Sequence, residues 1–113
     1  AEAAYRASVE AWPEHVAARA NLGVSLTRRG AYDDAVETLA AGAQYLNTTL
    51  GEKDATIATE LLTNLGVALE CVGRREDAVR VYESAVDASA GRDARPLTNL
   101  GAALQRLAEQ DDD

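Results

Sequence analysis

The chain of 113 residues is long enough for one domain but too short for two independent hydrophobic cores. Hydrophobic residues make up 47% of it and charged residues 27%, which excludes a disordered chain. A formal net charge of −8 disfavours binding to nucleic acid or to an anionic membrane surface, because phosphate groups repel such a protein. Alanine and leucine dominate the apolar residues while phenylalanine and methionine are absent, so the composition predicts an all-α domain.

Apolar residues recur three and four positions apart in six segments, which indicates six helices. These predicted helices are, in chain order, 1–11, 15–29, 32–47, 55–72, 75–89 and 94–109. Gly30 and Gly73 are predicted helix stops, because glycine adopts the left-handed conformation at little cost. The three aspartates of 111–113 are expected to form a solvated acidic tail.

A short motif recurs along the chain as Asn21-Leu22-Gly23, Asn64-Leu65-Gly66 and Asn99-Leu100-Gly101. In each case the glycine falls inside a predicted helix, where it costs about 1 kcal/mol relative to alanine. A cost that recurs at one position implies a recurring cause. We therefore expect a partner helix to cross too closely there for a side chain.

The residues around this motif resemble the tetratricopeptide repeat. The middle unit matches the family pattern at Leu65, Gly66, Leu69, Ala78, Tyr82 and Ala85. The preceding unit matches at Leu22, Gly23, Leu26, Ala35 and Leu39, with Gly42 in place of the usual alanine. The resemblance implies a right-handed α-solenoid of antiparallel helix pairs, with Ala1, Tyr5, Ser8 and Pro13 in the second half of an earlier unit.

In this scheme residues 1–110 form a single domain, followed by the tail at 111–113. The domain consists of a half repeat 1–13, repeats 14–54 and 55–91, and a half repeat 92–110. Additional length falls around residues 46–54, which makes the first full unit similar to the longer repeats of kinesin light chains.

The resemblance also implies a binding groove, because in this family the first helix of each pair lines the concave face. Asn21, Asn64 and Asn99 would then form a ladder of primary amides able to hold the backbone of an extended peptide. The alternative is that these asparagines only bind local water. Other expected groove residues are Val24, Arg28, Glu60, Val67, Arg95 and Arg106. The remaining positions are Ala17, Ala20, Thr27, Thr63, Glu70, Cys71, Thr98, Ala102 and Gln105, which together predict a shallow polar groove.

A carboxylate clamp for acidic chaperone tails is a second interpretation of the same groove. Asn21, Asn64 and Arg95 fit that clamp, but Ala17 and Asn99 replace two of its cations. Because charge-assisted hydrogen bonds carry this recognition, the sequence disfavours it.

No combination of residues indicates catalysis, a cofactor or a metal site. His15 stands alone and is expected on the surface or in packing, and Cys71 is expected to be a small apolar filler. The triplet Asn47-Thr48-Thr49 fits the glycosylation pattern, which matters only in a secretory setting, and Gly51-Glu52-Lys53 lacks the order of a phosphate loop.

The last predicted helix carries Leu97, Leu100, Leu104 and Leu107 on one stripe, without a following helix to cover it. Leu97, Leu104 and Leu107 are therefore expected to contact a downstream repeat, another copy of the chain or a partner subunit. The predicted function is a non-catalytic scaffold that binds a protein or an extended peptide.

Two alternatives remain: an assembly subunit docked into a multisubunit complex by its convex face and open ends, or an accessory domain of a longer regulatory protein. The chain is expected to be soluble, either cytoplasmic or in an organelle lumen if the Ala1 start reflects removal of a targeting segment.

Overall fold

A computed structural model describes residues 2–13, 15–46 and 55–111, and within them it contains α-helices and no strand. The helices are α1 (Glu2–Ala11), α2 (Val16–Arg28), α3 (Tyr32–Tyr45), α4 (Ala55–Cys71), α5 (Arg75–Ala88) and α6 (Ala94–Asp111). The prediction of an all-helical fold is confirmed, and the described helix ends fall within two residues of those expected. Helix α6 continues to Asp111, the first residue of the predicted tail.

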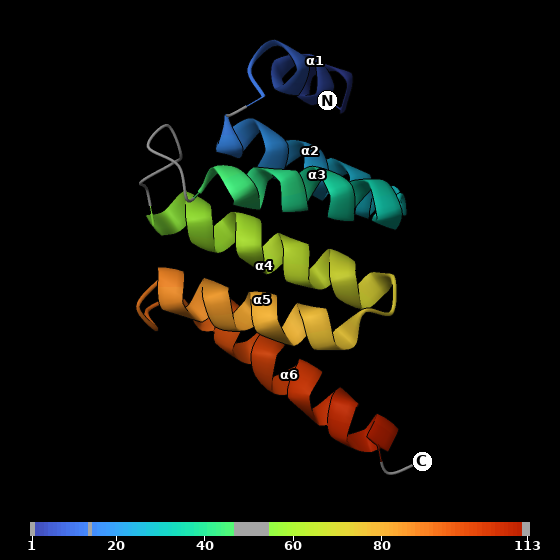
Figure 1. The fold of residues 1–113 in the computed structure, drawn as a ribbon, viewed down its shortest axis with the longest axis vertical. Coiled ribbons are helices and arrows are strands. Elements are labelled where there is room, and N and C mark those ends of the chain that lie inside the picture. Colours follow the sequence, from blue (N-terminus) through green and yellow to red (C-terminus); the bar gives the residue numbers. More distant parts are fainter. Residues whose placement is uncertain (1, 14, 47–54, 112–113) are drawn as a thin grey trace.

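Figure 1 shows the helices stacked along the long axis of the molecule, with α1 at the top and α6 at the bottom. Their contacts divide them into two layers. Helices α2, α4 and α6 contact one another in succession, whereas α1, α3 and α5 do not contact one another. Neighbours stand closer on the inside of a curved stack than on its outside. We therefore call α2, α4 and α6 the inner layer and α1, α3 and α5 the outer layer.

One packing arrangement occurs twice in this stack. Helix α2 lies against both α3 and α4, and α4 lies in the same way against both α5 and α6. Each of these two inner-layer helices thus lies between the two helices that follow it in the chain, one from the outer layer and one from the inner layer. Helix α1 contacts only α2, so among the described residues no helix is seated between α1 and α2.

The repeated glycines mark where the helices of a pair approach each other. A Cβ atom placed on Gly23 would lie 2.3 Å from the Leu39 side chain, and one on Gly66 would lie 2.3 Å from the Tyr82 ring. The expected close crossing is confirmed at these two positions. At Gly101 the expectation is wrong for the described residues, because nothing lies within 4 Å of the added Cβ.

The predicted helix stops are confirmed by the backbone. Gly30 and Gly73 have φ values of +85° and +87°, which glycine tolerates better than other residues. The next amides, of Ala31 and Arg74, donate to carbonyls five residues earlier at 2.9 Å. This is the Schellman arrangement, which satisfies the last carbonyls of α2 and α4. After α5 the same turn places Ala90 at φ 54°, an unusual value for a residue with a side chain.

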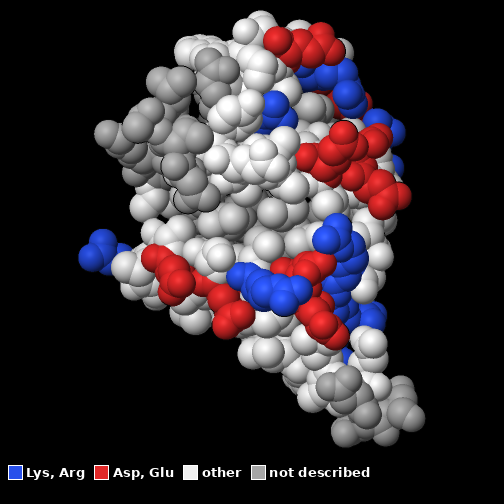
Figure 2. Space-filling view, in the orientation of Figure 1, with Lys and Arg blue, Asp and Glu red and all other residues white. Residues whose placement is uncertain are grey.

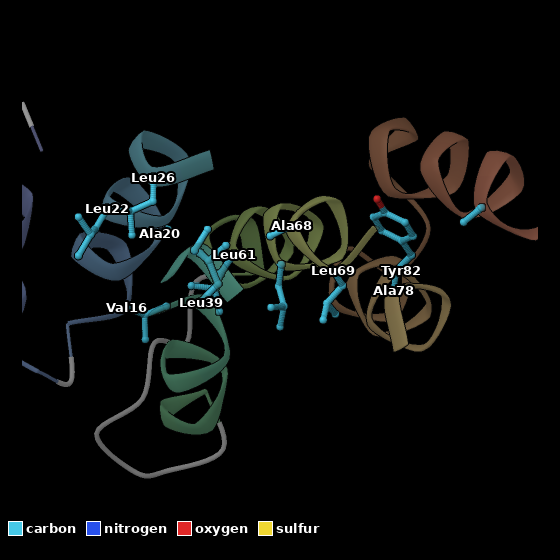
Figure 3. Packing of buried hydrophobic residues seen from close by; sticks show 13 residues of the cluster. Val16, Ala20, Leu22, Leu26, Leu39, Leu61, Ala68, Leu69, Ala78 and Tyr82 are labelled. Carbon is cyan, nitrogen blue, oxygen red and sulfur yellow. The ribbon is translucent and has the colours of Figure 1, made fainter. Parts of the chain in front are cut away.

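The hydrophobic core runs along the stack and has no single centre. Figure 3 shows it extending from Leu22 on α2, through Leu39 and Leu61, to Tyr82 on α5. Leu39, Leu61 and Tyr82 are fully buried. In a repeat stack each helix pair is stabilised by its neighbours, so the two ends depend on what covers them.

Candidate functional site

The three asparagines of the repeated motif lie on the three helices of the inner layer. Each precedes a leucine that packs toward the core, and one residue further round a helix corresponds to a rotation of about 100°. The asparagines consequently lie at the edge of the packed face, with Asn21 exposed and with Asn64 and Asn99 half-buried. None of the three side chains forms a hydrogen bond with another described residue. Their donors and acceptors are therefore available to water or to a ligand.

Two arginines expected in the groove are paired with carboxylates of the chain itself. Arg106 contacts Glu70 at 2.5 Å, and this hydrogen bond raises the pKa of the guanidinium. Arg95 contacts Asp93 at 2.6 Å, and the hydrogen bond lowers the pKa of that carboxyl. Both arginines would have to leave or share these partners before they could bind a carboxylate of a ligand.

The other expected groove residues differ in exposure. Arg28 and Glu60 are exposed, and Arg28 has no ion pair within the described part of the chain. Val24 and Val67 are half-buried, and Val67 packs against the core. The surface thus offers mixed polar and small apolar side chains.

The expectation that Ala20 and Thr63 line the groove is wrong, because both residues are buried. Ala20 is 6% exposed and Thr63 is 7% exposed, and the Thr63 hydroxyl donates to the Thr59 carbonyl at 2.6 Å. Both immediately precede a motif asparagine, a position that neighbouring helices cover in the middle of the stack. The equivalent Thr98, on the last helix, is exposed.

Charge is mixed on the surface. Figure 2 shows acidic and basic side chains intermingled over α5, where Asp77 pairs with both Arg74 and Arg80. Exposed ion pairs of this kind contribute little to stability. On the face that Figure 2 draws, they form no continuous basic stripe.

A pocket of about 440 Å³ opens between α1 and α2, and the sequence did not predict it. It is lined by Tyr5, Ser8, Ala11, Trp12, His15, Ala17, Ala18 and Asn21. The turn at its edge is ordered by His15, whose Nδ1 accepts a hydrogen bond from the Ala18 amide at 3.2 Å and whose ring meets Trp12 edge-on. Trp12, the single tryptophan of the chain, lies at this pocket and is 57% exposed.

The leucines of α6 divide between the core and the surface. Leu97 and Leu104 are 45% and 49% exposed, whereas Leu107 is half-buried close to the start of α5. The fully buried side of this helix is formed by the small residue Ala103 and by Pro96 near its start.

No group of three His, Cys, Asp or Glu side chains within the described ranges could hold a metal ion. Cys71 is exposed, so its expected role as an apolar filler is wrong; it lies beside, and not within, the stripe of Leu65, Ala68 and Leu69. The triplet Asn47-Thr48-Thr49 and the segment Gly51-Glu52-Lys53 lie outside the described residues. None of the helices is both long and apolar enough to span a bilayer, as judged on the described residues.

Residues 61–96 match the family model of the tetratricopeptide repeat. The matched segment comprises most of α4, all of α5 and the first residues of α6. A comparison with curated proteins finds no match. The match supports a tetratricopeptide repeat protein, and such repeats generally mediate interactions between proteins. The resemblance to the longer repeats of kinesin light chains rests on residues 46–54, of which 47–54 are not described.

Proposed function

We propose that the protein is a non-catalytic scaffold that binds an extended segment of a partner protein along its inner layer. The observation that carries this proposal is the set of three primary amides, those of Asn21, Asn64 and Asn99, at one repeat position and without hydrogen-bond partners in the described chain. Each amide provides two donors and an acceptor. It can therefore pair with a backbone amide and carbonyl of an extended peptide whatever the peptide's sequence.

The charges around this ladder favour a backbone-directed site over a clamp for acidic chains. Arg95 and Arg106 are held by Asp93 and Glu70, which supply the negative charge that a peptide carboxylate would otherwise contribute. Arg28 is the remaining groove cation without such a partner in the described residues. One isolated cation offers less charge-assisted binding than a clamp requires.

The amide ladder is tested with a peptide selected on the wild-type protein from a random displayed library. Replacing Asn64 with Ala should weaken binding by about 1–3 kcal/mol, because the peptide loses partners in a partly desolvated contact. The triple alanine variant at positions 21, 64 and 99 should bind at least about tenfold more weakly. Gln44→Ala removes an exposed amide from the outer layer and should leave the affinity unchanged.

Peptides that bind the triple variant as tightly as the wild type would contradict the proposal. They would favour the second candidate function, an assembly subunit that docks through the ends of the stack. That alternative is supported by the exposure of Leu97 and Leu104 on α6.

A further inference from the structure

The two ends of the stack carry complementary halves of one helix junction. Inside the molecule this junction is complete twice, with α2 seated between α3 and α4 and with α4 seated between α5 and α6. The pocket between α1 and α2 is the same groove one repeat earlier, and it is open. Helix α6 is an inner-layer helix that no following outer-layer helix covers within the described chain. We infer that α6 of a second copy of this chain docks into the groove between α1 and α2, which joins copies head to tail.

The repeat register identifies the residues that would meet. Tyr5 occupies the position of Leu39 and Tyr82, the two bulky side chains that lie against the repeated glycines in the complete junctions. Those two residues are fully buried, whereas Tyr5 is half-buried beside the open pocket. Of the three glycines in the repeated motif, Gly101 is the one with free space in front of it. At these repeat positions, the described chain therefore has a bulky side chain, Tyr5, that faces no glycine, and a glycine, Gly101, that faces no bulky side chain.

The leucine one turn after this glycine supports the same register. Leu26 and Leu69 are 0% and 4% exposed in the complete repeats, while the equivalent Leu104 is 49% exposed. A following outer-layer helix accounts for the difference, and α1 of another copy is a helix of that type. Docking would cover Leu104 together with Trp12, which at 57% exposure stands at the rim of the groove.

Polar groups and charges are compatible with this contact. The Tyr82 hydroxyl donates to Glu70 at 3.1 Å, and the repeat equivalent of Glu70 on α6 is Gln105. The Tyr5 hydroxyl can therefore donate to the side-chain oxygen of Gln105 in the second copy. The described residues that line the groove carry no carboxylate and no guanidinium.

A second copy is the occupant that satisfies both ends with one contact. The junction is heterologous, because different surfaces of the two copies meet, and each added copy leaves one groove and one α6 open. Association should thus continue past the dimer as the concentration rises. The groove shares Asn21 with the amide ladder, whereas the junction itself is carried by Tyr5, Gly101 and Leu104. A Gly101→Ala variant therefore tests the junction while all three amides are kept, which distinguishes its failure from a failure of the proposed function.

The inference is tested by sedimentation velocity over a concentration series of the full chain. The wild type should grow in sedimentation coefficient without a plateau at the dimer, and the emission of Trp12 should shift to the blue as the groove is filled. Gly101→Ala is the decisive variant, because its Cβ has free space in the single chain but would meet the Tyr5 ring of another copy. It should weaken association about tenfold or more while circular dichroism stays unchanged. Ser84→Ala, on the exposed side of α5, is the control and should associate as the wild type does.

A mixing experiment separates this junction from a symmetric dimer. Ser8→Arg fills the groove from an exposed position of α1 and leaves α6 intact, while Gly101→Ala leaves the groove intact. At a concentration where the wild type associates and each variant alone is monomeric, their mixture should form a one-to-one dimer that grows no further. A wild type that stays monomeric up to its solubility limit would overturn the inference. It would equally be overturned by a dimer that neither variant weakens, or by a mixture that fails to associate.

Discussion

Gly23, Gly66 and Gly101 occupy one position in three successive repeats but meet different surroundings. The first two face the side chains of Leu39 and Tyr82 at distances that exclude a Cβ atom. The third faces open space. The same amino acid is therefore required by packing at two positions, whereas at the third it only lowers the helix propensity of α6.

Alanine substitutions should have opposite effects at these positions. Gly66→Ala should lower the free energy of unfolding by about 1–3 kcal/mol, because the Tyr82 ring must move to admit the methyl group. Gly101→Ala should raise it by up to about 1 kcal/mol through helix propensity. Urea denaturation at low protein concentration, where chains do not associate, measures both. A loss of stability in Gly101→Ala would mean that a neighbour fills this space.

Tyr82 combines complete burial with a polar end. Its hydroxyl donates to Glu70, which also receives the guanidinium of Arg106. Burial of the phenol, followed by the nearby Glu70 carboxylate, raises the pKa of Tyr82 above its ordinary value of 10. The folded state therefore holds this proton more tightly than the unfolded state does.

Stability should consequently decline at alkaline pH. The contribution of Tyr82 is fully present below pH 10 and is lost as the pH rises above 10, by up to about 1.4 kcal/mol per pH unit. Tyr82→Phe removes the titrating group and should make the decline shallower, although it lowers stability at neutral pH by removing the bond to Glu70. Denaturation between neutral and alkaline pH gives the two slopes. Equal slopes for the wild type and Tyr82→Phe would show that the pKa of Tyr82 does not differ between the folded and unfolded states.

Individual helices follow from the sequence because their signals are local. Apolar spacing and the two stop glycines place the described helix ends within two residues of the expected positions. The exposure of a residue depends instead on whether the next helix is present. Ala20 and Thr63 are buried while Thr98 is exposed, although all three precede the same asparagine. A pattern repeated along the chain cannot encode that difference.

The helices should also differ in local stability. Among the described residues, helix α1 contacts only α2 and contributes no fully buried residue, whereas α4 contacts α2, α3, α5 and α6. Its ion pair between Glu2 and Arg29 is exposed and adds little. Hydrogen exchange at low protein concentration should therefore show the weakest amide protection in α1 and the strongest in α4. Equal protection of α1 and α4 would indicate that the stack opens only as a whole.

For the whole molecule, the sequence predicts the arrangement of the helices better than it predicts the grooves and binding sites on the surface. Repeat register and glycine positions are sufficient for an all-helical stack, because they determine which helices touch. They did not predict the groove between α1 and α2, because its shape depends on how far α1 and α2 stand apart and not on the residue pattern of either helix. The role of the asparagine ladder likewise depends on a partner whose sequence lies outside the chain.

Charge acts on the molecule as a whole. At a net charge of −8, we expect repulsion among the carboxylates to oppose the compact state more than the exposed ion pairs support it. Raising sodium chloride to physiological strength should therefore increase the free energy of unfolding modestly, by about 0.5 kcal/mol, through screening. Thermal denaturation of a dilute sample over a salt series measures this. A fall in stability with salt would instead assign the larger contribution to the ion pairs.

Because the same helix junction occurs twice in the stack, the number of repeats in such a chain can change during evolution without new contacts. Helices α4 and α5 accept α2 and α3 on one side and α6 on the other, and the motif recurs 35 residues apart, at Asn64 and Asn99. A tandem duplication of the segment between those asparagines would add a hairpin whose two faces its neighbours already fit. Each such event would lengthen the inner layer by one asparagine without redesigning any contact. The architecture can therefore be extended by copying DNA in whole units, and its reach along a partner can evolve without changes to its packing.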